Sequence, residues 1–155
     1  MFDRQTTLAF SGHRKYPDND ELKTALGFAL EKFYRAGYRT FLCGMADGFD
    51  ICAAEAVMEM KKRHDDIILV GIVPFDNHRH VIKNVGRYDS VTASTDVIVT
   101  LSRRYYSGCY YRRDDYLVEH ASALLCYCDG SASGTRYTVR KAESLGLKVE
   151  NIFKP

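Results

Sequence analysis

The sequence lacks the features that would place it in several large classes of protein. No apolar run approaches the roughly 20 residues that a membrane-spanning helix needs, and residues 1–4 lack the basic and apolar regions of a signal peptide. The five cysteines contain no C-x-x-C pair, and three of them lie within apolar runs, which is typical of buried thiols in a reducing compartment. These absences predict a cytoplasmic protein with no membrane partner.

The chain also lacks a large excess of charge of either sign. A net charge of +2 over 155 residues is too small to indicate a nucleic-acid-binding protein by itself. With 46% hydrophobic residues the chain can bury a substantial core, yet it is too short to hold two domains comfortably. We therefore expect one domain spanning residues 1–155.

Two common nucleotide-binding motifs are missing from the stretch around which the chain is organised. In residues 40–55 an apolar run ends at Gly44, a short loop carries Gly48, and a helical pattern opens at Asp50. The Walker motif requires Lys and Ser/Thr after its last glycine, where this chain has Phe49 and Asp50, and no G-x-G-x-x-G is present. A nucleotide triphosphatase or an ordinary dinucleotide dehydrogenase is therefore disfavoured. The glycines either aim backbone N–H groups at an anion or permit a tight turn.

Apolar runs alternate with helical patterns along the whole chain. The expected strands are residues 7–10, 41–43, 67–73, 97–101, 123–128 and 149–153. Helices are expected from Asp18, which forms a capping box with Glu21, and from Asp50, and three more over 77–94, over 114–121 and between Thr135 and Gly146. Parallel strands need crossover helices, so this order predicts an α/β protein with a mostly parallel sheet of about six strands covered on both faces.

The polar segments that follow the apolar runs are the expected ligand site, because ligands of open parallel sheets bind beyond the carboxyl ends of the strands. Five of the eleven glycines fall in these segments, whereas the turns at the opposite end contain only Gly37 and Gly146. Two glycine loops that each precede a helix favour a ligand carrying phosphate. The predicted ligand-binding residues are Ser11, Gly12, His13, Arg14, Gly44, Ala46, Asp47, Gly48, Asp50, Arg112, Arg113, Asp129, Gly130, Gly134 and Thr135.

Residues 103–113 hold four arginines and four tyrosines but no acid. Arg14, Arg112 and Arg113 are candidates for pairing with phosphate, and tyrosines can stack on a base. A solvated or subunit-packing surface explains the same composition equally well.

The remaining polar candidates are histidines and aspartates. His13 and the pair His78 and His80 have no further ligands at the spacing of a zinc site, so no metal is expected. Asp47 and Asp50 either cap a helix or accept ribose hydroxyls, and capping is the favoured role of Asp50.

Four motifs in this order resemble the YpsA-like family of the SLOG superfamily. They are S-G-H-R at 11–14, G-M-A-D-G-F-D with A-A-E over 44–55, Y-Y-x-R-x-x-Y-L-V-x-x-A-S over 110–122, and D-G-x-x-x-G-T-x-Y-T over 129–138. The superfamily also includes the LOG phosphoribohydrolases and the DNA-processing protein DprA. The resemblance implies a single Rossmann-like three-layer domain that binds a nucleotide or nucleotide-derived ligand.

The resemblance leaves the question of catalysis open. LOG enzymes carry P-G-G-x-G-T-x-x-E, and Gly134 and Thr135 match its G-T, whereas Tyr137 and Thr138 stand where the acid belongs. A glycosidase needs such a carboxylate. Arg113 matches the LOG arginine upstream. The carboxylates that could substitute are Glu55, Asp47 and Glu119, so Glu55 and Arg113 are the candidate catalytic residues.

We therefore expect a nucleotide-binding sensor or regulatory protein that forms a homodimer or higher homo-oligomer and needs no other cofactor. The alternatives are a LOG-like nucleotide N-glycosidic hydrolase and a DprA-like binder of single-stranded nucleic acid.

Overall fold

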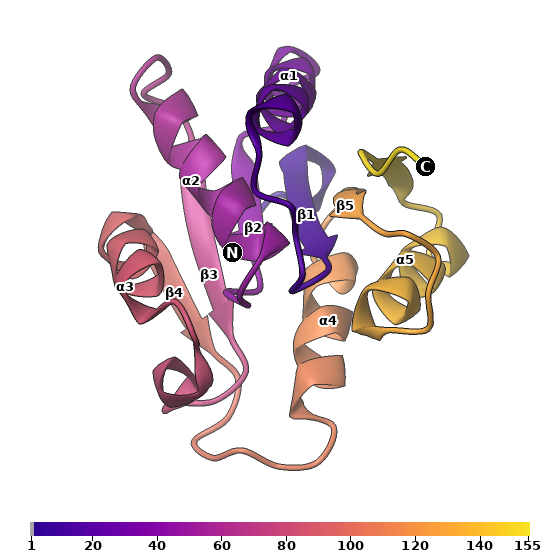
Figure 1. Ribbon diagram of the computed structural model, residues 1–155. Helices are drawn as coiled ribbons and strands as arrows, with labels where there is room; N and C mark the ends of the chain where they lie inside the picture. The colour runs from indigo at the N-terminus through magenta and orange to yellow at the C-terminus, as the bar shows by residue number, and fades with distance from the viewer. Residues whose placement is uncertain (1) are drawn as a thin grey trace.

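A computed structural model describes residues 2–155 (Figure 1). The strands are β1 (Thr7–Gly12), β2 (Thr40–Cys43), β3 (Ile68–Val73), β4 (Val97–Thr100), β5 (Ala123–Tyr127) and β6 (Lys148–Asn151). The α-helices are α1 (Asp20–Arg35), α2 (Phe49–Lys61), α3 (Val85–Ser94), α4 (Cys109–Glu119) and α5 (Gly134–Ser144). Two short 3-10 helices, η1 (Arg4–Thr6) and η2 (His78–Val81), complete the elements.

The six strands form one sheet in the order β4-β3-β2-β1-β5-β6, and every neighbouring pair is parallel. The register places Leu8 of β1 between Phe41 of β2 and Ala123 of β5. From β1 the chain builds the sheet outward to β4 and then crosses to the other side of β1. The strand order therefore reverses between β1 and β5, which is the point where ligands bind in sheets of this type.

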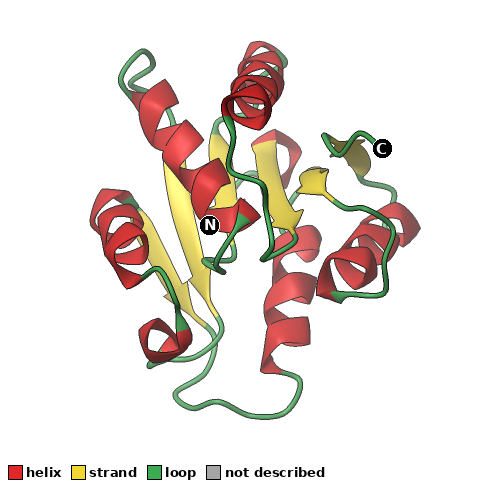
Figure 2. Ribbon diagram, in the orientation of Figure 1, coloured by secondary structure: helices red, strands yellow, loops and turns green. Residues whose placement is uncertain are grey.

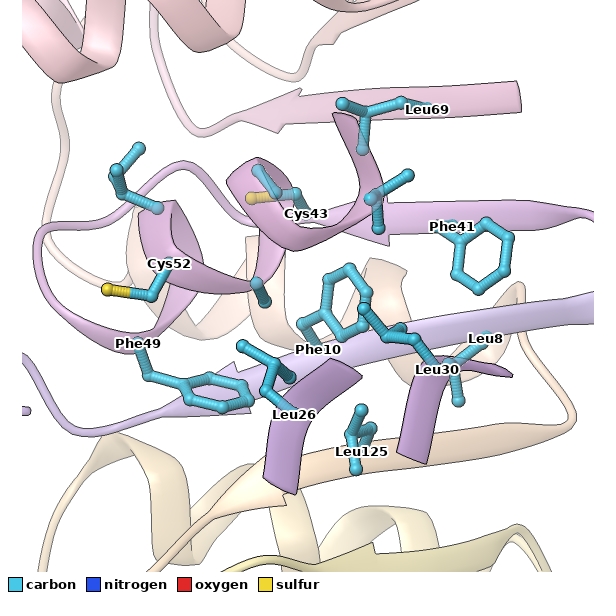
Figure 3. Packing of buried hydrophobic residues seen from close by; sticks show 14 of the residues in the cluster. Leu8, Phe10, Leu26, Leu30, Phe41, Cys43, Phe49, Cys52, Leu69 and Leu125 are labelled. Carbon is cyan, nitrogen blue, oxygen red and sulfur yellow. The ribbon is translucent and has the colours of Figure 1, made fainter. Parts of the chain in front are cut away.

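Helices cover both faces of the sheet (Figure 2). Helices α1, α2 and α3 contribute to the larger hydrophobic cluster, in which Phe10 lies 6.3 Å from Phe41 and 6.5 Å from Phe49 between ring centroids (Figure 3). Helices α4 and α5 cover the opposite face with Leu117 and Ala142. The predicted α/β class and its Rossmann-like three-layer arrangement are confirmed.

Smaller predictions of local structure are also answered. All five cysteines are buried free thiols, as expected. Gly37 and Gly146 directly follow the C-caps of α1 and α5 with φ of 104° and 80°, a conformation that glycine adopts without steric penalty. Within residues 2–155, the helices are all too short or too polar to cross a bilayer.

Two predicted helix caps are wrong. Asn19, one residue after Asp18, caps α1 by accepting a hydrogen bond from the Leu22 backbone N–H at 2.9 Å. Asp18 instead forms an ion pair with Arg87 at 2.9 Å. At α2 the cap position is Gly48, and Asp50 lies inside the first turn, where its Oδ2 accepts a hydrogen bond from the Ala46 backbone N–H at 3.2 Å. Asp50 is thereby turned back toward the preceding loop.

The helix expected over 114–121 begins earlier, at Cys109, after Gly108 with φ of 94°. The arginine- and tyrosine-rich stretch is therefore divided into an exposed loop and the first turn of α4. Helical geometry separates Arg112, which is exposed, from Arg113, which is buried. The segment 77–94 is likewise two elements, η2 and α3, rather than one helix.

Candidate functional site

A cleft of about 340 Å³ lies beyond the carboxyl ends of β1 and β5, where the strand order reverses. Its walls come from the end of β1 and the loop after it, the loop after β2, the first turn of α2, helix α4, and the N-terminus of α5. The lining residues are Phe10, Ser11, Gly12, His13, Arg14, Ala46, Asp50, Tyr110, Tyr111, Arg113, Asp114, Leu117, Ser133, Gly134 and Thr135. Nine of the fifteen predicted ligand-binding residues are among them.

Arg113 is the central charge of this cleft and is buried with 7% exposure. Its Nε donates to Asp114 Oδ1 at 3.2 Å, and its Nη1 donates to the Gly44 carbonyl oxygen at 3.2 Å. Burial opposes the charge, but the carboxylates of Asp114 and Asp50 outweigh it and raise the pKa of Arg113. Within residues 2–155 Nη2 donates no hydrogen bond, so one edge of the guanidinium remains available to a ligand.

Asp50 is a buried carboxyl with one oxygen unsatisfied. Its Oδ2 accepts from Ala46, whereas its Oδ1 has no hydrogen-bond partner among residues 2–155. Burial raises the pKa of Asp50 to about 6, and the charge of Arg113 works against this rise. Burial likewise raises the pKa of Asp114. The cleft therefore contains two carboxyl groups whose ionised form is disfavoured by burial. Such perturbed groups are more common at functional sites than elsewhere.

The N-terminus of α5 opens into the cleft. Ser133 caps the helix by accepting from the Arg136 backbone N–H at 3.2 Å, and Gly134 and Thr135 line the cleft directly after it. The first N–H groups of a helix have no intrahelical partner, and the helix dipole favours negative charge there. This end of α5 can hold a phosphate or carboxylate.

The ring of Tyr110 lies close to two arginine side chains of the cleft. The guanidinium carbons of Arg14 and Arg113 lie 5.4 and 5.3 Å from its ring centroid, within the range of cation–π attraction. Arg14 is exposed and Arg113 is buried, and both line the cleft.

Packing disfavours a side chain at Gly12, the last residue of β1, and at Gly44 and Gly48 in the loop after β2. A Cβ at Gly12 would lie 2.3 Å from the Phe49 ring, and one at Gly48 would lie 2.2 Å from the Arg14 carbonyl oxygen. A Cβ at Gly44 would lie 3.0 Å from Asp50 Oδ2 and 3.2 Å from Arg113. These contacts account for the three glycines without an anion, and a role for Gly44 and Gly48 in binding phosphate stays a prediction.

Six predicted ligand-binding residues lie outside the cleft lining: Gly44, Asp47, Gly48, Arg112, Asp129 and Gly130. Asp47 fixes the segment before α3 by accepting from the Lys83 and Asn84 backbone N–H groups at 2.9 and 3.1 Å. Asp129 lies 2.9 Å from His13 Nε2 and so ties the loop after β5 to the loop after β1. Both aspartates shape the surroundings of the cleft.

The candidate catalytic carboxylates of α2 and α4 are also elsewhere. Glu55 forms a bidentate ion pair with Arg87 of α3, and Glu119 pairs with Lys141 at 3.2 Å. Neither lines the cleft. The acids that do are Asp50 and Asp114.

The six lining residues that were not among the predicted ligand-binding residues are Phe10, Tyr110, Tyr111, Asp114, Leu117 and Ser133. The signal for Asp114 was obscured because α4 was expected to begin at that residue. With α4 beginning at Cys109, Arg113 and Leu117 are spaced i, i+4, and both face inward.

Metal ligands are not assembled in the part of the chain that the structure describes. No group of three or more histidine, cysteine, aspartate or glutamate side chains there is placed to hold an ion. His78 is buried beside Tyr88, and burial lowers its pKa to about 4, so it is neutral at physiological pH.

Comparison with known proteins places this geometry in context. A UPF0398 protein of Staphylococcus epidermidis is 27% identical over 126 residues, which cover 78% of this chain and 67% of the relative. The fold is similar to that of DprA from Streptococcus pneumoniae, with a TM-score of 0.72 and 13% identity, over 97% of this chain but only 51% of DprA. DprA from Helicobacter pylori, described as binding single-stranded DNA, gives a TM-score of 0.69 and 14% identity, over 94% of this chain and 64% of that one.

This chain thus spans about half the length of the pneumococcal DprA.

A family model matches residues 5–151 of this chain, which is nearly its whole length. By that match the chain belongs to the YspA SLOG family.

Proposed function

We propose that this chain binds a nucleotide in the cleft and acts as a sensor or regulatory protein, with the ligand's phosphate at the N-terminus of α5. The observation that carries the proposal is the buried Arg113, which has an uncommitted edge in the same cleft as that helix end. Membership of the YspA SLOG family supports a ligand of this class.

The size and charge of the cleft agree with a small phosphate-bearing ligand. Its volume of about 340 Å³ lies at the lower end of the roughly 300–1,000 Å³ of small-molecule sites, which suits a mononucleotide better than a dinucleotide. Arg14 and Arg113 balance Asp50 and Asp114 in number, so the positive partial charge at the N-terminus of α5, about half an elementary charge, is the feature that favours an anion here.

The experiment is a thermal-shift screen of nucleoside monophosphates and nucleotide sugars, followed by calorimetric titration of two variants. Arg113→Lys keeps a positive charge between the buried acids but replaces the planar fork with a single ammonium group. We expect it to weaken binding by at least about 1 kcal/mol, roughly fivefold, because a lysine cannot hold Asp114, Gly44 and the ligand at once.

Arg112→Lys is the matched control, because Arg112 is the exposed neighbour on the same helix and does not line the cleft. Its affinity should stay at the unmodified value. Equal affinities for the two variants, both folded, would assign Arg113 a structural role only and remove the main support for the cleft as the nucleotide site.

A second candidate function is the binding of single-stranded nucleic acid. The specific observation is the loop before α4, which exposes Arg103, Arg104, Tyr105 and Tyr106 beside the tyrosines of the cleft. Basic groups with stacking aromatics are the usual means of holding a single strand. If this candidate holds, an oligothymidylate will bind with a steep salt dependence, and Arg103→Ala with Arg104→Ala will reduce the slope.

A further inference from the structure

Two tyrosines in the first turn of α4 line the cleft, and they differ in how many side chains they contact. The ring of Tyr110 packs against Phe75 at 6.2 Å and lies beside the guanidinium groups of Arg14 and Arg113. Tyr111 also lines the cleft, but 54% of it is exposed. Its aromatic neighbour is Tyr137, whose ring centroid lies 4.8 Å away at an interplanar angle of 70°.

A chain of polar contacts holds this pair in place. The Tyr137 hydroxyl donates to Asp115 Oδ1 at 2.7 Å, and the same oxygen accepts from Lys141 Nζ at 2.8 Å. The edge-to-face contact with Tyr137 then fixes the orientation of the Tyr111 ring. A preorganised aromatic surface binds a ligand with little loss of side-chain entropy.

The position of Tyr137 relates this surface to the anion site. Tyr137 lies three residues after Gly134, so the two are separated by less than one turn of α5, about 4.5 Å along the helix axis. Tyr111 and the first residues of α5 line the same cleft, so one ligand can place an anion at the helix end and a base on the Tyr111 ring, with a pentose between them.

We propose that Tyr111 is the base-recognition residue of the cleft, with the nucleobase stacked on its exposed ring, so that the site selects nucleoside monophosphates over sugar phosphates without a base. The inference rests on the proposed function. Tyr137 contacts the Tyr111 ring at only one place, and 54% of Tyr111 remains exposed, so ring surface is open to a base.

The test is calorimetric titration of AMP and of ribose 5-phosphate into the unmodified protein and three variants. Base–aromatic stacking is worth about 1–3 kcal/mol by alanine substitution, so Tyr111→Ala should bind AMP about 5- to 150-fold more weakly. The unmodified protein should bind ribose 5-phosphate less tightly than AMP. Tyr111→Ala should bind ribose 5-phosphate as tightly as the unmodified protein does. Tyr111→Phe should retain most of the affinity for AMP because the ring is kept.

Tyr106→Ala is the matched control, because Tyr106 is exposed nearby but does not line the cleft. Its affinity for AMP should be unchanged. Thermal melting of each variant checks the fold, which removal of an exposed ring should leave intact.

Three results would overturn the inference in distinguishable ways. If ribose 5-phosphate binds the unmodified protein as tightly as AMP, or Tyr111→Ala binds AMP normally, the base platform is wrong while the phosphate site stands. If neither ligand binds, the proposed function fails as well. If an oligothymidylate binds far more tightly than thymidine monophosphate and Tyr106→Ala weakens it as much as Tyr111→Ala, the tyrosines form a track for single strands.

Discussion

Replacing Asp50 with asparagine should make the protein more stable at neutral pH. The carboxyl is buried, and its Oδ1 has no hydrogen-bond partner among residues 2–155. Burial raises the pKa of Asp50 from its ordinary value of 3.8 to about 6. Ionising it in the folded protein is therefore unfavourable, and an asparagine, which is neutral at every pH, avoids this penalty.

The sign and size follow from proton linkage. Because the pKa of Asp50 is higher in the folded than in the unfolded chain, its contribution to stability is fully present below pH 3.8 and is lost as pH rises through about 6. At 1.36 kcal/mol per pKa unit, the difference between about 6 and 3.8 corresponds to about 3 kcal/mol. Between about pH 4.5 and about pH 7.5 the loss is about 2 kcal/mol.

Urea unfolding of both proteins across this pH range measures the effect. The free energy of unfolding of Asp50→Asn minus that of the unmodified protein should increase by about 2 kcal/mol toward the upper end. Asp65→Asn, at an exposed position in the turn after α2, should show no such trend. A difference for Asp50→Asn that is flat, or that decreases with pH, would refute the assignment of a desolvated carboxyl at the cleft.

Three further predictions concern the glycines and the chemistry of the cleft. Gly134→Val should abolish nucleotide binding in calorimetry while melting normally, because its Cβ meets only Asp114 Oδ2 at 3.8 Å; retained affinity would argue against an anion at α5. Gly48→Ala should lower the unfolding free energy by about 1–3 kcal/mol more than Gly130→Ala, because both positions have φ of 87° and only Gly48 has a backbone oxygen in the way; equal losses in urea unfolding would contradict that clash. Chromatography should detect no release of adenine from AMP at a rate near the median kcat of enzymes, about 10 s⁻¹. The reason is that Tyr137 and Thr138 of α5 stand where LOG enzymes have an acid, and that Asp114 is paired with Arg113. Turnover at that rate would make Asp114, rather than Glu55, the first carboxylate to replace.

The layered fold could be predicted because its signals are local. The run from 67 to 73 is continuously apolar and becomes β3, a strand covered on both faces, and Gly37 and Gly146 occur where the helices end. The positions of Gly12, Arg14, Arg113 and Gly134 at one edge of the sheet follow from the same pattern, since the carboxyl ends of parallel strands lie together.

The interior of the cleft could not be predicted because it depends on contacts between distant segments. The spacing around Gly48 predicts an anion-binding loop, and it cannot reveal that a side chain at Gly48 would meet the Arg14 carbonyl oxygen. Asp50 had the position of a helix cap, and only the turn of the loop after β2 directs its carboxyl toward Ala46. Glu55 was separated from the cleft by its pairing with Arg87.

The most direct test of the central claim is a crystal structure of the protein grown with a saturating concentration of AMP. The account predicts that phosphate oxygens lie about 2.7–3.2 Å from the backbone nitrogens of Gly134 or Thr135, with the Arg113 guanidinium in contact with the ligand. AMP bound outside the cleft, or an empty cleft at saturating AMP, would contradict it.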